Sequence, residues 1–259
     1  MTSHPGFTLA TRLAAGDTIY SGWCGLTSPL VAEVLAREGF DAVTIDGQHG
    51  MWDQAATVAA IGSIRHGGAA PIVRVPLNDE AGVSRVLDWG AEGVIMPMVN
   101  TVDDAKRFVA AAKFPPGGER SWGPHRATML GRMPDQKIYL REANRLTVTL
   151  AMIETREALD NVEAIAAVPG IDMLFVGPSD LSIALSNGAD VDPHSAEVEQ
   201  ALDKIVAAAR KAHKWAGIYC MNAERALACA KRGFRFHAIG SDLGFLRAGI
   251  APQIKALKS

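Results

Sequence analysis

The sequence is poor in cysteine. Its 259 residues include only Cys24, Cys220 and Cys229, and no two of these have CxxC spacing. An odd number of cysteines so far apart argues against both a disulfide framework and a thiolate zinc site. Free cysteine is commonly a small buried apolar residue, and we expect that role for all three.

The chain also lacks an excess of positive charge and any long apolar run. Its formal net charge is −2 at pH 7, which provides no basic field for a nucleic-acid backbone or an anionic membrane surface. The N-terminal segment lacks a signal-peptide pattern, and eighteen apolar residues never occur in succession. We therefore expect a cytoplasmic protein that acts on small molecules, with no nucleic-acid partner and no membrane partner.

Several catalytic motifs are missing as well. The sequence contains no GxSxG, no P-loop and no GxGxxG after a predicted strand, which disfavours hydrolase, kinase and dinucleotide-binding functions. Every lysine falls on a predicted helix, on a loop or at the chain end, whereas Schiff-base chemistry needs a lysine at the end of a strand. Lysine-dependent aldolase and pyridoxal phosphate mechanisms are therefore disfavoured.

What the sequence does have is a repeated alternation of strand and helix patterns. Apolar residues make up 48% of the chain, enough for the large core of a single domain over residues 1–259. Short β-rich runs alternate with segments of helical period about eight times. Strands are expected at 18–24, 41–46, 70–76, 91–99, 145–154, 171–177, 215–221 and 236–242.

The helix signals between these strands support the same architecture. Ser28 and Pro29 mark the start of one helix, and Thr101 with Asp104 forms a variant of the capping box at another. Eight strand-then-helix units whose strands are apolar on both faces predict an α/β fold, a (β/α)₈ TIM barrel. A doubly wound sheet is the alternative.

One irregular segment, residues 115–136, interrupts the alternation. A loop of this length inside a compact domain is usually functional. It carries Arg120, His125, Arg126 and Arg132. These side chains could meet a carboxylate or polyhydroxyl substrate tail, and a solvated loop is an equal alternative.

Polar residues follow several of the predicted strands. In a barrel of this type the chemistry lies at the C-terminal ends of the strands, where the sequence places Trp23, Asp46 to His49, Arg74, Glu154 and Asp180. Each residue alone has a structural explanation, such as a surface ion pair or a helix cap, but together they predict one site. Two carboxylates without a Cys or His ligand favour Mg²⁺ or Mn²⁺, acting as a Lewis acid, over zinc.

Six segments in a fixed order resemble a known family and cover nearly the whole chain from Trp23 onward. They are DGQHG, VRVPLND, VLDWGAEGVIMPMV, KFPPGGER, MIET and VGPSDLS, and they resemble the HpcH/HpaI aldolases. These are metal-dependent class II pyruvate aldolases, which include 4-hydroxy-2-oxoheptanedioate aldolase and 2-dehydro-3-deoxyglucarate aldolase. The resemblance implies a carbon–carbon lyase that adds the enolate of pyruvate, or of a related 2-oxoacid, reversibly to an aldehyde to give 4-hydroxy-2-oxoacids. It also implies a barrel whose C-terminal helix is exchanged in a homo-oligomer, often a hexamer.

The resemblance also assigns roles by position. Glu154 and Asp180 match the ligands of the divalent metal, Mg²⁺ or Mn²⁺, with Co²⁺ as a further option. Arg74 matches the arginine at the keto or enolate oxygen, His49 the histidine that handles the aldol proton, and Asp88 its acidic partner. The substrate-binding set is Trp23, Arg74, Gly177, Ser179 and Asp180, in which the backbone N–H groups of Ser179 and Asp180 would hold the pyruvate carboxylate.

Two positions depart from the family pattern, and two other functions stay open. Many relatives have Glu at the position of Gln48 and Gln at that of Met152. An acyl-CoA enolate lyase of the malyl-CoA or citryl-CoA type is the alternative on the same barrel, but the sequence shows no basic cluster for coenzyme A. A non-enzymatic barrel used as a binding or assembly module would lack metal affinity and tolerate Glu154→Ala.

Overall fold

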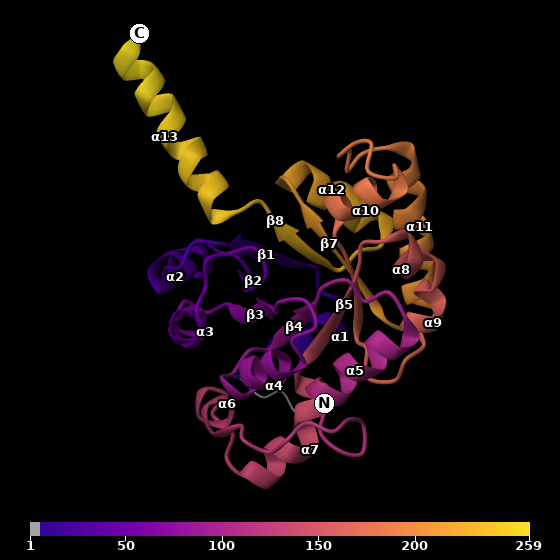
Figure 1. The fold of residues 1–259 in the computed structure, drawn as a ribbon. Coiled ribbons are helices and arrows are strands. Elements are labelled where there is room, and N and C mark those ends of the chain that lie inside the picture. Colours follow the sequence, from indigo (N-terminus) through magenta and orange to yellow (C-terminus); the bar gives the residue numbers. More distant parts are fainter. Residues whose placement is uncertain (1–5) are drawn as a thin grey trace.

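Eight parallel strands close into a barrel in the computed structural model, which describes residues 6–259 (Figure 1). Each strand pairs with the next along the chain, and β8 returns to pair with β1, with Ile19 beside Phe236. This closure confirms the predicted (β/α)₈ barrel and excludes the open doubly wound sheet. The strands are β1 Ile19–Cys24, β2 Ala42–Asp46, β3 Ala70–Arg74, β4 Gly93–Met96, β5 Val148–Ile153, β6 Met173–Val176, β7 Trp215–Cys220 and β8 Phe236–Ile239.

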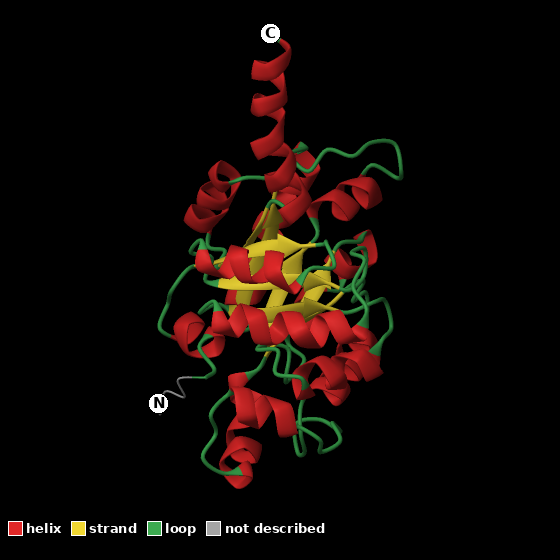
Figure 2. Cartoon of the chain, turned by 90° about the vertical axis from the view of Figure 1, so that its left-hand side faces the viewer, coloured by secondary structure: helices red, strands yellow, loops and turns green. Residues whose placement is uncertain are grey.

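Helices surround the strands (Figure 2). Side chains that alternate along each strand divide the core in two, one part inside the barrel and one between strands and helices. The helices are α1 Leu9–Ala14, α2 Pro29–Arg37, α3 Gln54–His66, α4 Glu80–Asp88, α5 Val102–Ala112, α6 His125–Leu130, α7 Gln136–Leu146, α8 Arg156–Asp160, α9 Val162–Ala166, α10 Pro178–Leu185, α11 Ala196–Lys211, α12 Ala223–Arg232 and α13 Asp242–Lys258.

The predicted helix starts are confirmed in detail. The Ser28 side chain accepts a hydrogen bond from the backbone N–H of Val31, and Pro29 occupies the first helical position of α2. Thr101 and Asp104 form both halves of a capping box at α5. These local signals fix where the chain turns from the end of a strand into the returning helix.

Four helical segments differ from the expectations. The expected strand 145–154 is shorter, because its first residues end α7, which buries Tyr139, Ala143 and Leu146. The irregular segment 115–136 contains α6, and α10 precedes α11 in the sixth unit. α1 plugs the N-terminal end of the barrel, where Leu9 and Leu13 join the interior core. None of these segments shows the alternating apolar pattern of a strand. The sequence therefore does not indicate where they pack, and only the tertiary structure shows it.

The last helix, α13, leaves the body of the molecule (Figure 1). Asp242 is its only buried residue. Its apolar side chains are exposed instead: Leu243, Phe245, Leu246, Ile250, Ile254 and Leu257. A helix in this position cannot bury its apolar residues against its own barrel.

The fold also bears on the cysteines and on membrane crossing. Cys24, Cys220 and Cys229 are buried free thiols, as predicted. In residues 6–259, no helix combines the length and the apolar character that crossing a membrane requires.

Candidate active site

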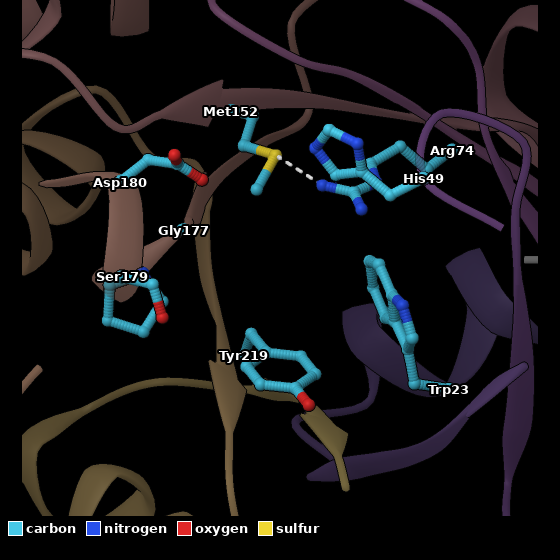
Figure 3. A pocket seen from close by; sticks show the side chains of 9 residues that line it. Trp23, His49, Arg74, Met152, Gly177, Ser179, Asp180 and Tyr219 are labelled. Carbon is cyan, nitrogen blue, oxygen red and sulfur yellow. Dashed lines mark hydrogen bonds between the residues drawn. The ribbon is translucent and has the colours of Figure 1, made fainter. Parts of the chain in front are cut away.

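A cavity of about 220 Å³ opens at the C-terminal ends of the strands. Its walls come from β1, β3, β5 and β7, from the loops after β2 and β6, and from the start of α10 (Figure 3). Most of the predicted site residues meet here, and no lysine is among the described residues that line it. The lining residues are Trp23, His49, Arg74, Met152, Gly177, Pro178, Ser179, Asp180 and Tyr219.

A buried ion pair orients the guanidinium of Arg74. Its Nε donates to Oδ1 of Asp46 at 2.9 Å and its Nη2 donates to Oδ2 at 2.8 Å. Burial alone would raise the pKa of Asp46, but the bonds from Arg74, the His49 backbone and the Trp23 indole lower it. Because the pair is bidentate and the guanidinium lies 4.8 Å from the Trp23 ring centre, Arg74 is held in one orientation.

The remaining edge of this guanidinium faces the cavity. Within the described part of the chain, Arg74 Nη1 has one neighbour in hydrogen-bonding range, the thioether sulfur of Met152 at 4.0 Å (Figure 3). A thioether is a weak acceptor, so Nη1 retains most of its capacity to donate to an incoming oxygen. Asp46 therefore holds one edge of Arg74 while the other stays available for a ligand.

The same aspartate shapes the loop that carries His49. The backbone N–H groups of Gln48 and His49 both donate to Asp46 Oδ1 at 3.1 Å. Gly47 donates to the carbonyl of Arg74 at 2.8 Å, and a Cβ at position 47 would lie 2.7 Å from that carbonyl oxygen. Only glycine allows this approach, which sets the exposed His49 imidazole at the rim of the cavity.

Asp180 lies across the cavity from Arg74 (Figure 3), and Glu154 lies beside Gly177, one of the lining residues. Glu154 is only 3% exposed, and its Oε1 accepts a hydrogen bond from the Met98 backbone at 2.8 Å. Burial, with a contribution from the negative charge of Asp180, raises the pKa of Glu154 to about 7. A Cβ on Gly177 would collide with Oε2 of Glu154, so glycine is required for the carboxylate to reach this position.

These two carboxylates suit a divalent cation bound through oxygen. A cation would offset both the burial of Glu154 and its repulsion from Asp180. In residues 6–259 no three His, Cys, Asp or Glu side chains gather in the manner of a complete metal site. Two protein ligands would leave positions for water or substrate oxygens, as is common for Mg²⁺.

The start of α10 adds an anion-binding element. Gly177 precedes the helix without a side-chain cap, and Pro178 occupies its first position. The N–H groups of Ser179 and Asp180 in the first turn therefore have no intrahelical partner and point out of the helix end. Since both residues line the cavity, a carboxylate can accept from them there.

Of the predicted site residues, Glu154 does not itself line the cavity but lies beside Gly177, whereas Asp88 lies far from the cavity. It ends α4, which runs back from the end of β3 to the start of β4. Its Oδ1 accepts from Arg120 Nη2 at 2.5 Å, and Arg126 donates to the carbonyl of Trp89 at 2.6 Å. Within one chain, Asp88 and the segment 115–136 therefore lie at the opposite end of the barrel from His49.

One lining residue was missed by the sequence analysis. Tyr219 of β7 packs edge-on against Trp23 with ring centres 5.4 Å apart, and its hydroxyl donates to the carbonyl of Gly240 at 3.1 Å. The signal was its place near the end of the seventh strand, where an aromatic looked like ordinary core. The sequence predicts Asp46 only as a polar residue at a strand end, whereas the structure makes it the centre of the Arg74 network.

Comparisons with known proteins agree with this geometry. The sequence profile of the HpcH/HpaI aldolase/citrate lyase family matches residues 20–248. The chain is 40% identical to a hydroxypyruvate/pyruvate aldolase from Rhizorhabdus wittichii, covering 90% of this chain and 91% of that protein. It is 37% identical to a 5-keto-4-deoxy-D-glucarate aldolase from Salmonella arizonae, covering 92% and 91%.

The fold also matches a solved structure closely. A HpcH/HpaI aldolase/citrate lyase family protein from Burkholderia cenocepacia superposes with a TM-score of 0.87 at 31% identity. The superposition covers 98% of this chain and all of that one.

Proposed function

The chain belongs to the HpcH/HpaI aldolase/citrate lyase family and is a carbon–carbon lyase of the aldolase type, and we propose that it adds the enolate of pyruvate, or of a related 2-oxoacid, reversibly to an aldehyde. One observation carries this proposal. The Asp180 carboxylate lies across the cavity from the free edge of Arg74 (Figure 3), and the Glu154 carboxylate lies beside Gly177, which lines the same cavity. A 2-oxoacid in the cavity would contact the carboxylates that bind the metal on one side and the fixed guanidinium of Arg74 on the other.

Glu154 and Asp180 would hold the divalent metal, Mg²⁺ or Mn²⁺. When bound, this ion supplies Lewis-acid polarisation of the 2-oxo group, which acidifies the neighbouring C–H bonds. The N–H groups of Ser179 and Asp180 at the start of α10 would receive the substrate carboxylate. This would place the 2-oxo group toward the middle of the cavity, whose walls include Trp23 and Tyr219.

Arg74 would stabilise the negative charge that develops on the 2-oxo oxygen. Its Nη1 donor faces the cavity, while Asp46 fixes the other edge of the guanidinium. A donor oriented before the reaction needs no reorganisation as charge appears, and such groups commonly contribute several kcal/mol to transition-state stabilisation. The same donor serves addition and cleavage, because the developing oxyanion is shared by both directions.

His49 would carry the proton of the aldol hydroxyl. In cleavage its imidazole takes the proton from that hydroxyl, and in addition it returns the proton to the new alkoxide oxygen. The proposed partner, Asp88, lies at the other end of the same barrel and is paired with Arg120. A pairing between His49 and Asp88 therefore requires Asp88 from a neighbouring copy of the chain.

The exposed face of α13 supports such an assembly. α2 and α13 form an apolar groove, lined among others by Leu30, Val34, Leu246 and Ile250. Exposed apolar surface of this extent marks an interaction site. We propose a homo-oligomer with exchanged C-terminal helices, a hexamer by the family resemblance, in which a second copy covers this groove.

The test of the proposed reaction needs no knowledge of the aldehyde. Proton NMR of pyruvate in D₂O, with chelator-stripped protein, should show loss of the methyl signal only after Mg²⁺ is added. Glu154→Ala should abolish the exchange, whereas Glu157→Ala, an exposed glutamate three residues further on, should retain it. Exchange that persists in Glu154→Ala or without added metal would contradict the proposal.

A further inference from the structure

A single buried carboxylate joins the projecting helix α13 to the active-site end of the barrel. Asp242 is 2% exposed, and it is the only buried residue of α13. It stands at the first position of the helix, directly after β8 and its Gly240–Ser241 turn. Every other residue of α13 is exposed, so the attachment of the helix to its own chain is concentrated at its base.

The Asp242 side chain is surrounded by donors from the end of β1. Its Oδ1 accepts from the backbone N–H of Gly25 at 3.1 Å, and its Oδ2 accepts from that of Leu26 at 2.8 Å. The Cys24 thiol donates to Oδ2 at 3.2 Å. A buried carboxylate with this many donors fixes the backbone that immediately follows Trp23, a wall of the cavity.

The loop held by Asp242 is in turn bonded to the loop that carries His49. The carbonyl of Gly25 accepts from the N–H of Met51 at 3.0 Å. The Trp52 indole donates to the carbonyl of Cys24 at 3.0 Å. The chain just after His49, at Met51 and Trp52, is therefore hydrogen-bonded to the Cys24–Gly25 segment that Asp242 holds in place.

We propose that Asp242 is a positioning residue, which holds the Trp23 and His49 loops in their working geometry and makes that geometry depend on the base of α13. The inference rests on the proposed function for its catalytic consequence, since it presumes that His49 moves the aldol proton. Asp242 makes no bond to the metal side of the cavity, where Glu154 and Asp180 follow β5 and β6. Its loss should therefore impair proton transfer and leave metal binding intact.

The substitution that tests this is Asp242→Asn, which keeps the shape of the side chain. An amide has one acceptor oxygen and an NH₂ group, so one of the Gly25, Leu26 and Cys24 donors would face another donor. A misplacement of about 1 Å can cost about 100-fold in rate. We expect kcat for addition of pyruvate to glycolaldehyde to fall about 10- to 100-fold, with Mn²⁺ affinity by electron paramagnetic resonance unchanged.

Glu92→Gln is the matched control. Glu92 is likewise a buried carboxylate that accepts from two successive backbone N–H groups, those of Thr8 at 2.7 Å and Leu9 at 2.8 Å. It lies at the other end of the barrel, just before β4. The control substitution should lower the thermal midpoint but leave kcat and KM per folded molecule within about two-fold, because it removes comparable bonds far from the cavity.

Amide hydrogen exchange gives a readout that is independent of activity. In Asp242→Asn, peptides covering residues 22–28 and 47–54 should exchange faster, and Glu92→Gln should leave both unchanged. Unchanged exchange in Asp242→Asn, an unchanged kcat, or an equal loss of Mn²⁺ affinity would each overturn the inference. If the wild-type protein has no lyase activity, the proposed function fails, and the exchange result still decides whether Asp242 positions these loops.

Discussion

Charged side chains are buried at both ends of the barrel, but the two ends use them differently. At the N-terminal end, the Lys113 ammonium donates to the carbonyls of Asn144 and Thr147 and to Asp172, at 2.7 to 2.9 Å. Glu92 accepts two backbone bonds and pairs with Arg65. Lys113 and Glu92 thus form their hydrogen bonds with other groups of the same chain, as buried charges with a structural role do.

At the C-terminal end, the charged groups keep donor or acceptor atoms that a ligand can use. Arg74 binds Asp46 with one edge and leaves the other toward the cavity. Glu154 is buried with one backbone donor and with no cation paired to it among residues 6–259, and burial raises its pKa to about 7. Arg120 at the other end is also incompletely paired, since its buried Nε and Nη1 have no partner among residues 6–259, but it does not line the cavity. The comparison teaches that incompletely satisfied charges at a cavity, more than burial or charge alone, distinguish the functional end of this barrel.

Removing His49 should have the largest effect at the functional end. We expect His49→Ala to lower kcat for aldol addition about 100- to 10,000-fold, since general acid–base groups contribute on this scale. Mn²⁺ titration should show unchanged metal affinity. His66→Ala, an exposed histidine at the end of α3, should behave as wild type, and full turnover in His49→Ala would remove the proton-transfer role.

Removing Lys113 should show the opposite pattern, with lost stability and retained chemistry. Lys113→Met leaves the partly exposed Asp172 without its cation, and breaking such a pair should cost about 3 kcal/mol in the free energy of unfolding. Urea denaturation would measure the loss, with Lys211→Met, which breaks an exposed pair, as the control. A lower kcat per folded molecule in Lys113→Met would contradict the purely structural role assigned to the charges at the N-terminal end.

His237 sharpens the comparison, because it is a buried titratable group away from both ends. It points outward from β8 toward Tyr20, is 0% exposed and has no hydrogen bond to either ring nitrogen among the described residues. Burial lowers its pKa from 6.5 to about 4. Between these pH values, His237 is protonated in the unfolded chain but stays neutral in the folded chain. Stability should therefore fall as pH drops below 6.5, by about 3 kcal/mol once pH 4 is reached.

The His237→Phe variant isolates this contribution from that of the carboxylates. Its free energy of unfolding should depend less on pH between 6.5 and 4 than that of the wild type. Urea midpoints across this range measure the difference in slope, which is insensitive to any constant change in packing. Parallel pH profiles for the two proteins would show that His237 is not buried as an uncharged group.

The sequence alone was a good guide where the signal is local or repeated. Alternating apolar strands and capped helices predict the barrel, and the polar residues that close its strands predict the cavity, because parallel strands bring their C-terminal ends to one rim. Trp23, His49, Arg74, Gly177, Ser179 and Asp180 do line it. The sequence does not single out Tyr219, because the apolar pattern of a strand does not show whether an aromatic residue will line the cavity or pack in the core.

The tertiary structure alone decided which charges are satisfied and which are left open. Asp46 and Asp88 read alike in the sequence, as acids at the ends of apolar segments, but one orients Arg74 in the cavity and the other pairs with Arg120 at the far end. Asp242 is the last residue of the expected strand 236–242, and only the return of β8 to β1 brings it to Gly25 and Leu26. The physical reason is that repeating patterns are properties of neighbours along the chain, whereas hydrogen-bond partners distant in sequence exist only once the barrel has closed.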